Sequence, residues 1–128
     1  MNKTFLITAA LLGALSVVLG AFGAHGLKGR MNAETFEVFE TAIKYQFYHV
    51  FALLAVGIIS QYMPGSFLVW SGRCFIAGII LFCGSLYLLT YFKAAGTEHM
   101  NWIGAITPVG GLCFISGWIL LAVAVIRS

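Results

Sequence analysis

Residues 5–24 read FLITAALLGALSVVLGAFGA and contain no charged side chain. A predominantly apolar run of this length, coiled as a helix, spans the roughly 30 Å hydrocarbon core of a bilayer. A backbone surrounded by lipid has to satisfy its own hydrogen bonds, and a helix does so within one segment. The stretch therefore predicts a transmembrane helix in a chain whose solvent is largely lipid.

The same stretch also resembles a secretory signal peptide, because Lys3 precedes it and the small residues Ala21 and Gly23 lie near its end. Its apolar run is longer than the roughly 7–15 residues of a signal core. We therefore expect a helix that is retained in the mature protein.

The composition of the whole chain supports a membrane location. Of 128 residues, 61% are hydrophobic and 9% are charged, against about 45–50% and about 25% in an average soluble chain. A soluble domain of this size has too much exterior to hide so much apolar surface. The net charge of +3 comes from seven basic and four acidic residues that form no basic face, so we expect no nucleic-acid partner.

Charged residues divide the rest of the chain into three further apolar segments, 43–61, 74–92 and 102–126. Each is close to or above the roughly 17–25 residues that cross a bilayer. We predict a single domain over residues 1–128, an all-α integral membrane protein with four transmembrane helices in a compact bundle.

An amphipathic stretch lies between the first and second segments. Asn32 is a plausible N-cap, and Glu34 suits the positive end of a helix dipole. Phe36 and Phe39 then repeat at helical spacing, with charged residues on the opposite side. The pattern predicts a short interfacial helix over about residues 32–42 that runs into, or kinks before, the second spanning helix. A water-exposed loop helix is the alternative.

Small residues recur along the apolar segments, where close helix packing in lipid needs them. The predicted helix-packing positions are Gly13, Ser16, Gly20, Gly84, Ser85, Gly110, Gly111 and Gly117. Rows of small residues of this kind serve contacts between subunits equally well.

Cys74, Cys83 and Cys113 are odd in number and form no C-x-x-C pair. They are therefore interpreted as small buried hydrophobes, and no metal site is predicted.

The basic residues divide almost evenly between the two sides of a four-span chain. Lys3, Arg73 and Arg127 fall on the side of the termini, and Lys28, Arg30, Lys44 and Lys93 fall on the other side together with all four glutamates. The rule that cytoplasmic loops are rich in Lys and Arg therefore gives a near tie. We expect both termini in the cytoplasm, and insertion in both orientations stays open.

Polar residues gather at the membrane end where the first helix stops and the second begins. This predicted cluster comprises His25, Tyr45, Gln46, His49 and Thr107, with His99 at the same end. Polar groups within a span are costly unless they are paired, so they tend to point into the bundle. The cluster is interpreted as a hydrogen-bond network that joins the helices, or as a titrating or ligand-binding pair of histidines. Two histidines without a third ligand are a weak metal signal, and no cofactor is predicted.

Pro108 allows two interpretations of the fourth segment. In the first turns of a helix a proline costs little, because an early N–H lacks an acceptor anyway. If the helix instead begins at Trp102, Pro108 kinks it, and an interrupted helix can mark a transport site.

Four blocks of the sequence resemble a known family. LGAFGAHGL, FETAIKYQFYHVFAL, GSLYLL and ITPVGGLCFISGW are similar to the small bacterial inner-membrane family of unknown function represented by YgdD-like and YwdK-like proteins. The resemblance covers nearly the whole chain. It implies a multi-pass inner-membrane protein and no particular reaction.

These observations favour a non-enzymatic membrane protein that acts through structure, lipid contact or a partner. No nucleophile, base and orienting group occur together, so no catalytic residue is predicted. The expected partners are membrane lipid and either further copies of the chain or another membrane protein. The alternative is a small oligomeric transporter or channel subunit that uses His25, Tyr45, Gln46 and His49. A haem or quinone protein would rest on His25 and His49 alone.

Overall fold

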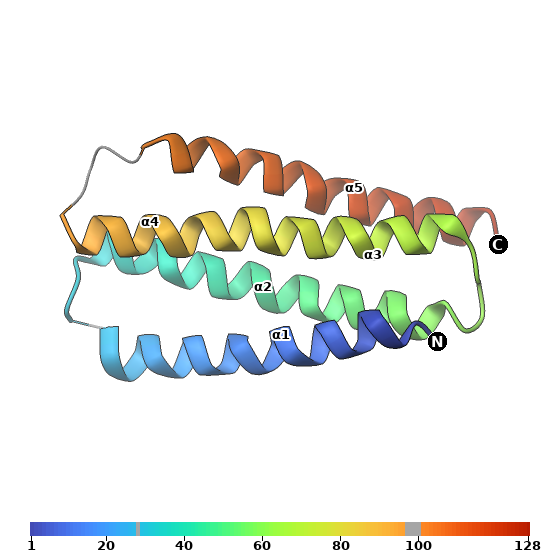
Figure 1. Ribbon diagram of the computed structural model, residues 1–128, viewed down its shortest axis with the longest axis horizontal. Helices are drawn as coiled ribbons and strands as arrows, with labels where there is room; N and C mark the ends of the chain where they lie inside the picture. The colour runs from blue at the N-terminus through green and yellow to red at the C-terminus, as the bar shows by residue number, and fades with distance from the viewer. Residues whose placement is uncertain (28, 97–100) are drawn as a thin grey trace.

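The computed structural model describes residues 1–27, 29–96 and 101–128, and every element in this part of the chain is helical (Figure 1). The elements in chain order are α1 (Lys3–Phe22), the π-helical segment η1 (Gly23–Leu27), α2 (Ala33–Ile59), α3 (Ser66–Gly78), the π-helical segment η2 (Ile79–Cys83), α4 (Gly84–Ala94), the 3₁₀ segment η3 (Asn101–Ala105) and α5 (Ile106–Ile126). Segment η1 continues α1, and η2 joins α3 and α4 into one long helix.

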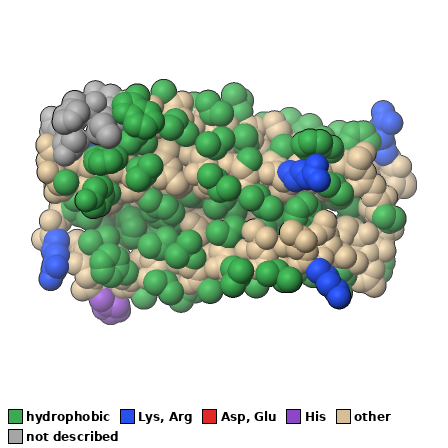
Figure 2. Space-filling view, in the orientation of Figure 1, with side chains coloured by type: hydrophobic (Ala, Val, Ile, Leu, Met, Phe, Trp, Pro, Cys, Tyr) green, Lys and Arg blue, Asp and Glu red, His purple; other side chains and the backbone are tan. Residues whose placement is uncertain are grey.

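Within these described residues, four helices are long and apolar enough to cross a membrane: Lys3–Leu27, Ala33–Ile59, Ser66–Ala94 and Trp102–Ile126. They lie along the long axis of the molecule as an antiparallel bundle, and both termini lie at the same end (Figure 1). Apolar side chains cover most of the visible surface between the two ends (Figure 2). The predicted all-α fold with four spanning helices is confirmed.

Asparagine side chains cap the first two helices at their N-termini. The Asn2 side chain accepts a hydrogen bond from the Phe5 N–H at 3.1 Å, and the Asn32 side chain accepts one from the Thr35 N–H at 2.7 Å. Each bond satisfies a donor that has no partner within the helix. The Asn2 N–H also donates to the Gly57 carbonyl at 3.0 Å, which ties the start of α1 to the end of α2.

No break separates the amphipathic stretch at 32–42 from the segment at 43–61. Residues 33–59 form one helix, α2, so the stretch runs directly into the second spanning helix. The third spanning helix begins at Ser66, well before residue 74. The charge of Arg73 does not end it, because this exposed guanidinium lies 4.8 Å from the centre of the Trp70 ring on the same helix.

Pro108 lies in the first turn of α5, which begins at Ile106 after the 3₁₀ segment. Its missing N–H is one that the first turn would leave without a helical acceptor. The helix continues to Ile126 without interruption. Of the two interpretations of Pro108, the structure adopts the one that needs no kink.

Aromatic rings pack against glycines where neighbouring helices meet. A Cβ atom on Gly72 would overlap the Phe5 ring, and one on Gly78 would overlap the Phe114 ring. Phe75 is fully buried, and a Cβ atom on Gly117 would overlap its ring as well. These contacts bring α1 and α5 close to the third spanning helix, as expected for helices packed in lipid.

Candidate functional site

The polar centre of the bundle is built around the Gln46 side chain, which is 1% exposed. Its Nε2 donates to the Leu12 carbonyl on α1 at 3.0 Å. Its Oε1 accepts a hydrogen bond from the Tyr87 hydroxyl on α4 at 2.6 Å. One amide therefore joins three spanning helices through its donor and its acceptor.

His49, three residues further along α2, is held through both ring nitrogens. Nδ1 lies 2.7 Å from the Tyr45 carbonyl, and Nε2 lies 3.1 Å from the indole nitrogen of Trp118 on α5. An indole N–H can only donate. Nε2 must therefore accept, and Nδ1 carries the proton that is donated to Tyr45. This neutral ring also stacks on Phe114, with the ring centres 3.5 Å apart.

Two serines complete the set of bonds between helices. The Ser85 and Thr107 hydroxyls lie 2.5 Å apart and join α4 to the start of α5. The Ser71 hydroxyl donates to the Gly117 carbonyl at 2.7 Å and joins α3 to α5. Within the described residues, no buried side-chain nitrogen or oxygen lacks a hydrogen-bond partner. The polar side chains of the interior are thus satisfied by one another or by backbone carbonyls.

The structure separates His25 from the rest of the predicted cluster. Gly13 packs near Val50 and Gly23 packs against Phe39, which fixes how α1 lies along α2. His25 therefore lies about 18 Å along the helix axis from the level of His49, from the rise of ~1.5 Å per residue. Its side chain is exposed in η1.

Tyr45 also lies outside the hydrogen-bonded interior, since its side chain is 39% exposed and its carbonyl, not its hydroxyl, forms the hydrogen bond with His49. Gln46 and His49 are buried, and Thr107 reaches the interior through Ser85. His99 and Lys28 fall outside the residues that the structure describes.

The predicted packing residues differ in how closely atoms of other residues approach them. A Cβ atom on Gly110 would overlap the Phe82 backbone, and one on Gly117 would overlap the Phe75 ring. Gly13, Gly20 and Gly111 leave room for ordinary contact, with nearest atoms at 3.5, 4.0 and 3.9 Å respectively, and Gly84 has no atom within 4 Å. Ser16 is buried and donates to the Leu12 carbonyl.

Sequence reasoning did not place Ser71, Tyr87 and Trp118 in the site. Tyrosine and tryptophan usually lie at the ends of a membrane span. Tyr87 and Trp118 instead lie about two turns from the ends of their spans. This unusual depth was the feature of the sequence that could have placed them in the site. Ser71 offered no such feature, because the hydroxyl of a serine in a membrane helix often donates to a carbonyl of its own helix.

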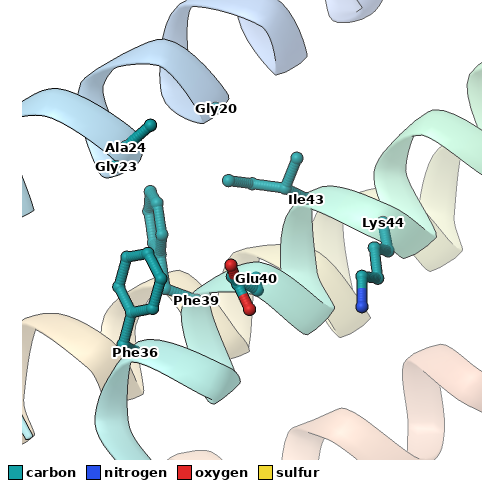
Figure 3. A pocket seen from close by; sticks show the side chains of 8 residues that line it. All are labelled: Gly20, Gly23, Ala24, Phe36, Phe39, Glu40, Ile43 and Lys44. Carbon is teal, nitrogen blue, oxygen red and sulfur yellow. The ribbon is translucent and has the colours of Figure 1, made fainter. Parts of the chain in front are cut away.

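Several concave surfaces lie on the outside of the described bundle, and two of them lie away from the end that carries the termini. The α2–α5 groove has a volume of about 520 Å³, and its lining includes Tyr45, Tyr48, His49, Phe82, Gly111 and Trp118. The α1–α2 pocket has a volume of about 250 Å³, and its lining includes Gly20, Gly23, Phe36, Phe39, Glu40 and Lys44 (Figure 3). Both surfaces are lined in part by exposed side chains, so they are open to the surroundings of the bundle.

The donor groups of the described chain suit structure better than metal binding. Cys74, Cys83 and Cys113 are free thiols. No three side chains of His, Cys, Asp or Glu come together within the part of the chain that is described. His49 has no lone pair left for a ligand, because one nitrogen donates and the other accepts.

Comparison with known proteins gives consistent matches along the chain. A family model described as "Protein of unknown function (DUF423)" matches residues 19–111. The UPF0382 membrane protein YwdK of Bacillus subtilis (strain 168) is 38% identical over 126 residues, which cover 98% of each chain. A UPF0382 membrane protein of Staphylococcus aureus (strain bovine RF122 / ET3-1) is 44% identical over 125 residues, covering 98% of this chain and 97% of the relative. No solved structure matches.

Proposed function

The chain belongs to the DUF423 family of membrane proteins of unknown function, and within that family we propose for this chain a non-enzymatic role, exerted by lateral contact with membrane lipid. A groove on the outside of a bundle is exposed first to acyl chains. The partner proposed for the α2–α5 groove is therefore a lipid chain, and a second copy or another membrane protein is the competing occupant.

The contrast between the interior and the outer surface carries this proposal. Gln46, His49 and Thr107 are the polar residues best placed to act on a substrate, and each is engaged by another helix. The α2–α5 groove instead presents aromatic side chains outward, among them Tyr45, Tyr48 and Trp118. Its surface is mostly apolar with a few polar tips, which suits a flexible amphipathic ligand.

A transporter or channel subunit receives less support from the same geometry. Transport requires polar groups along the path that can exchange partners with a substrate, and such groups face a cavity. The uninterrupted α5 also lacks the broken-helix site expected if Pro108 kinked the span. Proteoliposomes are expected to show proton and potassium fluxes no greater than those of empty vesicles. Flux above that background would favour the transporter.

We also propose that the protein lies in the bacterial inner membrane with both termini in the cytoplasm. Lys3, Arg73 and Arg127 belong to the half of the bundle that carries the termini, where the described residues include no acidic side chain. The glutamates Glu34, Glu37 and Glu40 all lie near the start of α2, at the opposite end.

Filling the α2–α5 groove tests the lipid contact. In a Trp70→Phe/Trp102→Phe background, Trp118 is the single tryptophan and lines the groove. Lipids brominated on their acyl chains are expected to quench its fluorescence, and Gly111→Leu is expected to reduce this quenching by about half. A Cβ on Gly111 meets its nearest atom at 3.9 Å, so the added side chain has room to occupy the groove.

Gly84→Leu is the matched control for this experiment, because Gly84 has open space around its Cβ position and does not line the groove. It should leave the quenching of Trp118 unchanged. Equal quenching in the parent and in Gly111→Leu would contradict a lipid chain in the groove. Loss of quenching at high protein-to-lipid ratio alone would instead indicate that a second copy covers it.

A further inference from the structure

We propose that the α1–α2 pocket binds the headgroup end of a phospholipid with a primary ammonium group, with Lys44 contacting the phosphate and Glu40 the ammonium. The inference rests on the proposed lipid-contacting role and assigns one lipid class to one site. It concerns a different surface from the α2–α5 groove, so the two can be tested separately.

The pocket has apolar walls and a charged opening. Gly20 and Gly23 present no side chain on the α1 wall, while Phe36 and Phe39 project from α2 toward that gap (Figure 3). Gly23 is closed off by the Phe39 ring, and Gly20 has its nearest neighbouring atom at 4.0 Å. The volume of about 250 Å³ is enough for the glycerol region of one lipid and too small for its two full chains.

Counting along α2 places the charges at the boundary of the hydrocarbon. The helix ends at Ile59 with its cap at Ser60, and Gly57 is tied to the start of α1. About 20 residues of helix cross the hydrocarbon core, so a count back from Ser60 reaches Glu40. Glu40 therefore lies at the boundary, and Lys44 lies about one turn, or ~6 Å, deeper.

The order of these charges matches one headgroup. In a phospholipid the phosphate lies next to the glycerol, and an ammonium group, where present, lies further out toward water. Lys44, on its long aliphatic stem, extends outward from the hydrocarbon toward the phosphate. The Glu40 side chain starts about one turn further out and leans toward the N-terminus of α2, in the direction of the ammonium. Both side chains are exposed and line the same pocket.

Other common headgroups fit this pair less well. An anionic lipid without an ammonium group leaves the Glu40 carboxylate facing negative charge. A choline headgroup carries no N–H, so it cannot donate to the carboxylate. A primary ammonium donates up to three hydrogen bonds, and bonds between charged groups are the stronger kind. Glu40 therefore distinguishes one lipid headgroup from another, while Lys44 contributes to the binding of any lipid phosphate.

Native mass spectrometry of the full-length protein, titrated with phosphatidylethanolamine, phosphatidylcholine and phosphatidylglycerol of identical chains, tests the inference. The wild-type protein is expected to retain phosphatidylethanolamine about tenfold better than phosphatidylcholine, the ratio that one charge-assisted hydrogen bond gives. Glu40→Gln should reduce this ratio to about one. Lys44→Gln should weaken retention of all three lipids.

Glu37→Gln is the matched control, because Glu37 is an exposed glutamate on the same helix that does not line the pocket. It should keep the full preference, and size-exclusion elution should show that every variant remains folded. Equal retention of the two zwitterionic lipids by the wild-type protein would overturn the inference. A preference that survives Glu40→Gln would overturn it as well.

Failure of this inference is distinguishable from failure of the lipid-contacting role. If Gly111→Leu shields Trp118 from brominated chains while no headgroup preference is found, only the α1–α2 assignment is wrong. If neither effect is observed, both proposals are wrong.

Discussion

At the scale of single residues, the side chains of α2 show why buried polarity in lipid is shared between helices. Gln46 and His49 lie on one face of α2, and between them they contact α1, α4 and α5. The alternating use of donors and acceptors leaves neither ring nitrogen of His49 free. The residue that the sequence marks as a possible ligand is therefore part of the framework.

The hydrogen bond between Trp118 and His49 should be measurable as a coupling energy. Trp118→Phe removes the donor and keeps an aromatic ring, and His49→Ala removes the acceptor. We expect the two changes to be non-additive by about 0.6 kcal/mol, the average for hydrogen bonds between membrane helices, and by no more than about 1.7 kcal/mol, the largest such value. Reversible unfolding in mixed micelles, analysed as a double-mutant cycle, gives this value. A coupling near zero would contradict the bond.

His25 and His49 should behave independently, in contrast to that pair. They lie about 18 Å apart along the bundle, and residues at such separations add to within about 0.5 kcal/mol. We expect His25→Ala to change the free energy of unfolding little, since its side chain is exposed. The same unfolding assay on the two single variants and the double variant measures this. A larger interaction energy would mean that the two histidines meet.

At the scale of whole elements, the contact between α5 and the π-helical segment η2 brings a glycine against the backbone of a neighbouring helix. Gly110 lies against the backbone of Phe82, whereas most other tight glycines meet the ends of side chains. A backbone cannot move aside as a side chain can. Gly110 is thus the position in α5 where the absence of a Cβ is most strictly required.

Adjacent glycines in α5 provide a matched comparison of this requirement. Gly110→Ala places a Cβ on the Phe82 backbone and is expected to destabilise the protein by about 1–3 kcal/mol, as overpacking does. Gly111→Ala meets its nearest atom only at 3.9 Å and is expected to be neutral or to stabilise by up to about 1 kcal/mol, since alanine favours a helix. Unfolding of the two variants side by side measures the difference. Equal effects would contradict the close approach.

The helical elements were predictable from the sequence to differing degrees. Asn32 marks the start of α2 as its capping chemistry predicts. The packing positions of the third span, predicted at Gly84 and Ser85, were harder to predict, because a sequence pattern is interpreted with a regular repeat of 3.6 residues per turn. Segment η2 follows Gly78 and changes that repeat. Gly78 meets Phe114 just before this segment, while Gly84 just after it faces open space.

At the scale of the whole molecule, the number of spans followed from length and hydropathy, and the comparisons confirm the expected family. The partners of each helix did not follow. Helices that are apolar all round carry little information about which face is buried. Trp118 and Ser71 meet residues far away in the sequence, so a pattern within one segment could not reveal them.

The bundle predicts that both termini and the connection at Pro64 lie on one side of the membrane (Figure 1). Reporter proteins fused in turn to each terminus should give signals from the same compartment, and we expect the cytoplasm. A cysteine introduced at Glu34, at the other end of the bundle, should react with an impermeant reagent from outside. Signals from opposite compartments for the two termini would contradict an even number of spans.

The π-helical segment η2 has a consequence for how this protein tolerates deletion. A π turn holds one more residue than the α turn it replaces, so Ile79–Cys83 is the place in the third span where one residue can be removed with little change in length. Such a deletion would leave Ser66 and Ala94 at their membrane surfaces and would keep the orientation of α4 relative to α3. The bonds of α4 to its partners, Tyr87 with Gln46 and Ser85 with Thr107, would then be retained, and the cost would fall on the contact between η2 and α5 at Phe82 and Gly110.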